Sequence, residues 1–123
     1  MKVDHWSAYQ RHHLEVQSLL DERFYPIAWV DQRVWMGAIR LLADDHAIIG
    51  FEIKQYPGGA RELHGMFACG AMGSILALID EAVEFAREMG CHVACIESRP
   101  GWAKVLKSRG FEPHQLRIVK ELG

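Results

Sequence analysis

Apolar residues recur along this chain at two different spacings, and each spacing predicts a different kind of element. Three- and four-residue steps from Trp6 to Leu20 predict a first helix that ends near Glu22. The same steps run from Ser74 to Met89, where they predict a long helix with one strongly apolar face. Because a helix of this kind packs on a sheet, strands are expected on either side of it.

Four shorter runs predict strands, of which the first alternates loosely and is rich in Ile and Phe and the others carry apolar residues over a strand-like length. The turn Pro57-Gly58-Gly59 joins the first two runs and predicts a hairpin. The four predicted strands occupy residues 46–55, 60–67, 91–96 and 115–122.

A second, shorter helix is predicted between the last two strands. It opens at Arg99-Pro100-Gly101-Trp102 and ends at Gly110. The order of all these elements predicts a single domain over residues 1–123 of the α/β (α+β) class. Its mixed central sheet is expected to be flanked by helices.

Two boundaries leave alternatives open. Either Asp4 or Ser7 is suited to cap the first helix. The segment 29–42 favours a helix capped by Asp31, but its apolar residues also fit a strand over 34–41.

Composition and charge narrow the function classes. The chain has 123 residues, of which 50% are hydrophobic, and a formal net charge of −2, which offers no basic field for nucleic acid. No apolar run is long enough to cross a membrane, and the first residues lack the apolar core of a signal peptide. These features predict a protein of the reducing cytoplasm with neither nucleic acid nor membrane as a partner.

The cysteines and histidines give no sign of a metal site. Three cysteines, Cys69, Cys91 and Cys95, show no zinc-type spacing, and the pair His12-His13 does not form an i, i+4 ligand pair. We therefore expect no metal and interpret the thiols as small buried hydrophobes. A nucleophilic Cys69 at a helix N-terminus is the alternative.

The stretch from Ala60 to Pro113 contains the most informative order: strand, glycine turn, long helix, strand, and a short helix closed by Gly110-Phe111. A strand that runs into a helix N-terminus can form an anion site, because the first N–H groups of a helix have no internal partners. This arrangement resembles the GNAT superfamily of N-acetyltransferases, whose corresponding turn holds the pyrophosphate of acetyl-CoA. The resemblance implies acetyl-CoA or CoA as cofactor, bound by Phe67, Cys69, Gly70, Ala71, Met72, Gly73 and Ser74.

The segment from Gly90 to Phe111 looks most like small GNAT-like proteins of tailed phages and prophages. That narrower resemblance implies protein partners such as phage virion components. It also implies a location in the host cytoplasm or in association with the virion.

The phosphate turn departs from the GNAT pattern Arg/Gln-x-x-Gly-x-Gly/Ala. Ala68 stands at the charged or amide position and Ala71 at the first glycine, while Gly73 fits. A Cβ at Ala71 restricts positive φ, and the missing arginine removes a charge-assisted contact. Anion binding is therefore expected to be weakened.

The catalytic positions depart as well. The family's proton-donating tyrosine falls on Leu106 and its asparagine on Arg99. Leucine cannot transfer a proton, so an active enzyme needs another acid, for which Glu97 is the nearest candidate. Glu62 or His64, on the predicted hairpin, is the candidate base for a substrate amine, and an ordinary strand-surface role is the alternative.

These departures predict a GNAT-fold protein with an eroded acyl-CoA site, non-catalytic or weakly active, that serves as a structural, internal or assembly protein. The alternative is an acetyl-CoA-dependent N-acetyltransferase that acts on an amine. The tryptophans, Trp6, Trp29, Trp35 and Trp102, are either core residues or exposed anchors for a protein partner.

Overall fold

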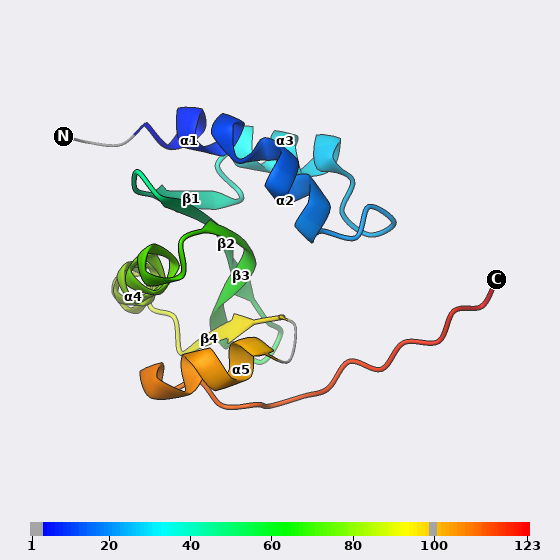
Figure 1. Cartoon of the computed structure of the whole chain (residues 1–123). Coiled ribbons are helices and arrows are strands. Elements are labelled where there is room, and N and C mark those ends of the chain that lie inside the picture. Colours follow the sequence, from blue (N-terminus) through cyan, green and yellow to red (C-terminus); the bar gives the residue numbers. More distant parts are fainter. Residues whose placement is uncertain (1–3, 99–100) are drawn as a thin grey trace.

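The computed structural model describes residues 4–98 and 101–123. Its elements follow the order of helices, hairpin, long helix, strand and short helix (Figure 1). They are α1 (His5–Arg11), α2 (His13–Leu19), α3 (Ile27–Trp35), β1 (Arg40–Ala43), β2 (Ala47–Gln55), β3 (Arg61–Gly70), α4 (Met72–Glu88), β4 (Val93–Ile96), α5 (Gly101–Leu106) and the 3-10 turn η1 (Lys107–Arg109).

The four strands form one mixed sheet in the order β1-β2-β3-β4. The first three strands are antiparallel, whereas β3 and β4 are parallel and joined through α4. This sheet, flanked by helices, confirms the predicted fold class. The predicted hairpin and long helix are confirmed in β2, β3 and α4.

Helices cover both faces of the sheet and create two apolar cores (Figure 1). Under α1, α2 and α3 the core is centred on Tyr9, Val30 and Ile48. Under α4 and α5 it is centred on residues such as Phe51 and Ile79. Among the described residues, no helix is long and apolar enough to cross a membrane.

The first helix begins as predicted, because the Asp4 carboxylate accepts hydrogen bonds from the amides of Trp6 and Ser7. It is divided at His12 into α1 and α2 and ends at Leu19, short of Glu22.

In segment 29–42 the structure differs from the preferred prediction, which was a helix capped by Asp31. Helix α3 begins at Ile27, directly after Pro26, and ends at Trp35. Gly37 then takes a φ of 80°, which turns the chain into strand β1. Asp31 lies inside the helix and accepts a hydrogen bond from the Tyr9 hydroxyl at 2.6 Å, so its side chain ties α3 to α1.

The predicted last strand, 115–122, is wrong. Residues 110–123 have no regular secondary structure and run away from the body of the protein (Figure 1). Leu116, Ile118 and Leu122 are 83%, 86% and 89% exposed. An alternating pattern is not enough for a strand, whose backbone groups need a neighbouring strand. The segment instead contacts the loop before α3, through an ion pair of Glu121 with Arg23 at 2.7 Å.

The tryptophans divide into two groups. Trp6 and Trp102 are partly buried against the two cores, whereas Trp29 is 38% and Trp35 75% exposed. Residues Arg99 and Pro100, at the predicted opening of the second helix, lie outside the described residues.

Candidate functional site

The parallel strands β3 and β4 pair over a short distance only. Their register runs from Glu62 opposite Val93 to Gly65 opposite Ile96. Beyond that point β3 continues to Gly70 without a partner in β4. One edge of β3 therefore presents backbone N–H and C=O groups beside the gap, and these groups need hydrogen-bond partners.

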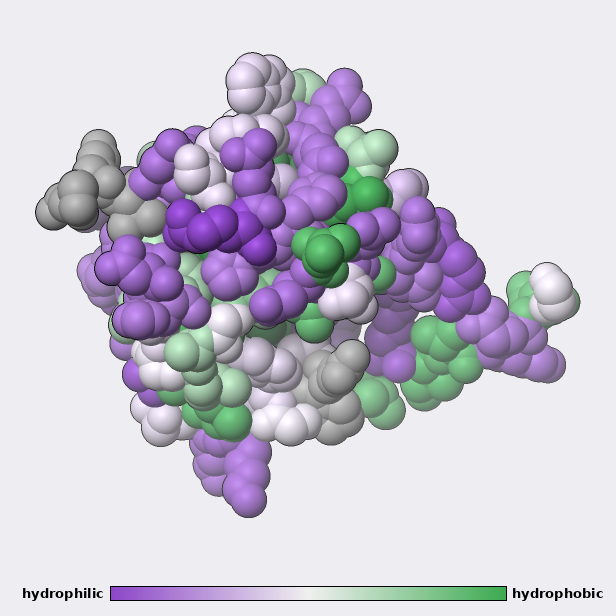
Figure 2. All heavy atoms as spheres, turned by 45° about the horizontal axis from the view of Figure 1, so that its top comes forward, coloured by the Kyte–Doolittle hydropathy of each residue, from purple (hydrophilic) through white to green (hydrophobic). Residues whose placement is uncertain are grey.

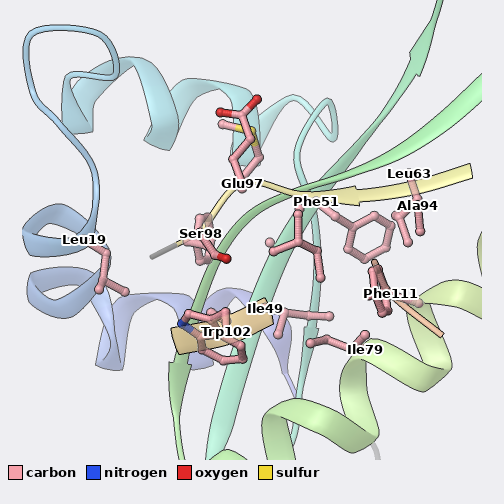
Figure 3. Close-up of a pocket in the computed structure, with 17 residues that line it drawn as sticks. Leu19, Ile49, Phe51, Leu63, Ile79, Ala94, Glu97, Ser98, Trp102 and Phe111 are labelled. Atoms are coloured by element: carbon pink, nitrogen blue, oxygen red, sulfur yellow. The ribbon is translucent and has the colours of Figure 1, made fainter. Parts of the chain in front are cut away.

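A cavity of about 240 Å³ occupies this gap. Figure 3 shows the apolar side chains of Phe51, Ile79 and Phe111 grouped on one side of it, with Glu97 on the other. Its lining comes from the sheet, α4, α5 and Leu19 of α2, namely Leu19, Ile49, Gly50, Phe51, Leu63, Gly65, Met66, Phe67, Ala68, Ile79, Ala82, Ala94, Ile96, Glu97, Ser98, Trp102 and Phe111. We call this cavity the β3–β4 slot. It suits an elongated ligand that combines apolar groups with amides.

Helix α4 begins where β3 ends. Ala71 is its N-cap residue and makes no side-chain capping bond, so the amides of Met72, Gly73 and Ser74 head the helix. A helix N-terminus carries a partial positive charge, which attracts anions. The amide of Ala71 does not contribute, since it donates to the carbonyl of His46 at 3.1 Å.

The predicted turn over residues 68–73 is partly wrong. Ala68, Cys69 and Gly70 belong to β3, because they continue its pairing with β2. Ala71 has a φ of −70°, so its Cβ causes no backbone strain. The positive φ of this turn, 112°, belongs to Gly70. The sequence-based objection that a Cβ at Ala71 hinders the turn therefore does not hold.

A carboxylate lies beside the start of α4. Asp44 accepts hydrogen bonds from the amides of His46 at 2.7 Å and Ala47 at 2.8 Å, and the side chain of Ser74 is near enough to help lower its pKa. These hydrogen bonds, led by that from the amide of His46, hold the pKa of Asp44 below its usual value. A negative charge near Ser74 opposes a phosphate at the same helix end.

Two of the predicted catalytic residues, Glu62 and His64, lie two positions apart on β3. Leu63, between them, packs under α4, so both of these side chains point to the opposite face of the sheet. His64 is buried, and its Nδ1 lies 3.3 Å from Glu62 Oε2. Its Nε2 lies 3.8 Å from Oε1 of Glu97, so the structure brings all three predicted residues together.

Two further residues complete this cluster, and sequence analysis did not single them out for it. The Tyr56 hydroxyl donates a 2.8 Å hydrogen bond to Glu62 Oε2. Cys95 stands opposite His64 in the β3–β4 register, and burial raises the pKa of its thiol. Neither contact is visible in the sequence, because the hairpin register and the parallel register create them.

The remaining predicted residues have varied surroundings. Phe67 is buried in the core under α1, α2 and α3, and it borders the slot. Cys69 is buried in the same core, and burial raises its thiol pKa to about 12. A thiol of that kind stays protonated, which favours the structural interpretation over a nucleophile. Leu106 is buried and has no proton to transfer.

Neither a protein-family model nor a curated protein sequence matches the chain. Solved structures do match it along nearly its whole length. An acetyltransferase from Trypanosoma brucei is 16% identical with a TM-score of 0.66, covering 94% of each chain. A predicted acetyltransferase from Clostridium acetobutylicum, solved with acetyl-CoA, is 13% identical with a TM-score of 0.65, covering 99% of this chain and 94% of that one.

A third structure is a ribosomal-protein-alanine N-acetyltransferase from Brucella melitensis biovar Abortus 2308. It is 14% identical with a TM-score of 0.63, covering 96% of this chain and 91% of that one. Together these likenesses show that the chain has the fold of the GNAT acetyltransferases. At such low identity the likeness is one of fold.

Proposed function

We propose that this chain is an acyl-CoA-binding protein of the GNAT fold that binds its ligand weakly and transfers acetyl groups slowly or not at all. The observation that carries the proposal is the β3–β4 slot. Its apolar lining suits an acyl group and methylene chain, and the edge of β3 beyond Gly65, which β4 does not pair, can offer hydrogen bonds to the amides of a pantetheine arm. The solved structure with acetyl-CoA belongs to the same fold.

Weak binding is expected at the phosphate end. The amides at the start of α4 are the only attraction that the turn itself offers, since Ala68 and Ala71 carry no charge. The Asp44 carboxylate, which lies near Ser74, opposes the pyrophosphate there. Most of the binding free energy must then come from the slot.

Slow transfer is expected because the CoA thiolate lacks a proton donor at the family's usual position. Glu97 borders the slot and can accept a proton from an amine directly, whereas His64 lies outside the slot lining and reaches the amine only through Glu97, 3.8 Å away. The amine nitrogen then attacks the thioester carbon, the C–S bond breaks, and the CoA thiolate leaves and needs a proton. Leu106, at the family's donor position, cannot supply it. An efficient N-acetyltransferase would require Glu97 to act as a relocated acid, in which case Glu97→Gln abolishes turnover in a folded protein.

The second candidate is a role through protein contacts, including assembly of a phage particle. Several large apolar side chains are exposed, and they favour it: Leu14, Trp35, Met36, Leu116, Ile118 and Leu122. On the face shown in Figure 2, however, hydrophilic residues dominate and apolar groups are scattered. Co-purification of the chain with assembled particles tests this candidate.

Isothermal titration with acetyl-CoA tests the proposal. We expect a Kd of about 0.1–1 mM, which corresponds to about −5.5 to −4.1 kcal/mol. Ala68 lines the slot, so Ala68→Leu should fill it and abolish binding. Ala77 is exposed on α4, and Ala77→Leu is the matched control. Binding that is absent from the wild type at millimolar ligand, or that survives Ala68→Leu unchanged, would overturn the proposal.

A further inference from the structure

Although the spacing of cysteines and histidines in the sequence led us to expect no metal, we propose that Glu62, His64 and Cys95 bind one divalent transition-metal ion, and that zinc fits the site best. One donor atom of each residue lies within 4.8 Å of those of the other two. The proposal stands apart from acyl-CoA binding, because these donors lie outside the lining of the β3–β4 slot.

Two paired strands set the positions of the three donors. Glu62 and His64 are two residues apart on β3, so their side chains share one face of the sheet. The parallel register places Cys95 of β4 directly opposite His64. A site built from neighbouring strands is held by the sheet itself, which reduces the cost of ordering the ligands.

The distance between His64 and Glu62 suits a shared ion. Nδ1 and Oε2 are 3.3 Å apart, which is long for an N–H···O hydrogen bond. Two ligands that bind zinc tetrahedrally at about 2.0–2.1 Å are themselves about 3.3 Å apart. A thiolate at its usual zinc distance would lie about 3.6 Å from them. The three donor atoms lie within 4.8 Å of one another, so metal binding requires the most distant two to move closer by about 1 Å at most.

The surroundings of these donors resemble the second shell of a metal site. With an ion on Nδ1, the Nε2–H group of His64 faces Glu97 Oε1 at 3.8 Å, in the order carboxylate, imidazole, metal. The Tyr56 hydroxyl bonds Glu62 Oε2 at 2.8 Å and orients that carboxylate. The His64 and Glu62 side chains are only 6% and 12% exposed, so few waters compete for them.

Charge and donor type favour a soft dication. Glu62 and Glu97 place two carboxylates beside His64, and a dication would offset their charge. A mixture of nitrogen, sulfur and oxygen donors suits zinc, whereas calcium and magnesium take oxygen ligands. Binding would release the thiol proton of Cys95 to solvent as the metal–sulfur bond forms. The rival interpretation is a metal-free His64 in polar contact with the two carboxylates.

The test is a Co²⁺ titration of the untagged, chelator-treated chain, followed by displacement with Zn²⁺. We expect one ion per chain, with a thiolate-to-cobalt charge-transfer band in the near ultraviolet. Cys95→Ser should remove that band and weaken binding at least tenfold. Cys91 packs against the core under α4 and α5 and supplies the matched control, because Cys91→Ser should keep both the band and the affinity. Glu97→Gln should weaken binding about 10- to 100-fold through the second shell.

The absence of a charge-transfer band in the folded wild type would overturn the proposal and favour a metal-free cluster. Equal spectra for Cys95→Ser and Cys91→Ser would overturn it as well. A urea denaturation midpoint measured for each variant shows that it is folded. The acetyl-CoA titration is a separate measurement, so the metal site and the acyl-CoA site can fail independently.

Discussion

Gly70 and Gly73 lie on either side of the junction between β3 and α4, yet they have different roles. Gly70 has a φ of 112°, and a Cβ there would lie 2.2 Å from the carbonyl oxygen of His46. We therefore predict that Gly70→Ala destabilises the fold by about 2–4 kcal/mol, from backbone strain and overpacking. Urea denaturation measures this cost.

Gly73→Ala is the matched control. A Cβ at Gly73 meets nothing within 4 Å, and the residue lies in the first turn of α4. Alanine should leave stability unchanged or raise it by up to about 1 kcal/mol. Equal denaturation midpoints for the two variants would show that the turn is not packed as described.

Asp44 gives a prediction with a pH dependence. Its folded-state pKa is held below the usual 3.8, so its hydrogen bonds contribute stability above pH 3.8 that is lost as the pH falls through the folded pKa. Asp44→Ala should cost about 1 kcal/mol at neutral pH, and the difference from the wild type should vanish in acid. Asp45, its exposed neighbour, supplies the control variant. A difference that persists unchanged at pH 2 would contradict the assignment.

Individual residues also show the limits of sequence reasoning. The resemblance to the GNAT superfamily suggested Glu62, His64 and Glu97 as candidate catalytic residues, and the structure brings these three together. It did not place Tyr56 or Cys95 beside them, because hairpin register and parallel-strand register are not written in local spacing. Nor could it show that the positive φ belongs to Gly70.

Among the helices and strands, those with a strongly periodic sequence were predicted correctly as to their type. Their first and last residues were predicted less accurately. The hairpin strands and α4 follow directly from two-residue and 3.6-residue spacing. Segment 29–42 contains both a helix and a strand, divided at Gly37, so neither pure alternative was correct. The last predicted strand failed because a strand depends on a neighbour that the sequence does not specify.

Trp102 tests how α5 is held. Of the two alternatives left open for the tryptophans, core residue or exposed anchor, Trp102 is nearer the first, since it is partly buried against the core under α4 and α5 and lines the slot. Trp102→Ala should therefore cost about 1–3 kcal/mol, less than a fully buried tryptophan, and should weaken acetyl-CoA binding as well. Trp35→Ala is the control, since Trp35 is 75% exposed. An unchanged midpoint for Trp102→Ala would show that α5 is not anchored by this ring.

The whole molecule consists of two cores that share one sheet, with the C-terminal segment outside both. We predict that removal of residues 113–123 shifts the denaturation midpoint less than Trp102→Ala does. The segment's contacts, Arg23 with Glu121 and Arg117 over the Phe24 ring, are on the surface. A large loss of stability would show instead that the segment pairs with a strand edge, and a change of elution volume on size exclusion would indicate another copy as its partner.

The central claim is that the slot, and not the start of α4, supplies most of the affinity for an acyl-CoA. Isothermal titration of the same protein with acetyl-CoA and with S-acetylpantetheine, which lacks the nucleotide and pyrophosphate, tests it most directly. If the slot supplies most of the affinity, the two Kd values lie within about threefold of each other, a difference below about 0.7 kcal/mol. Micromolar binding of acetyl-CoA, with S-acetylpantetheine 100-fold weaker or more, would contradict it and show an intact pyrophosphate site at the N-terminus of α4.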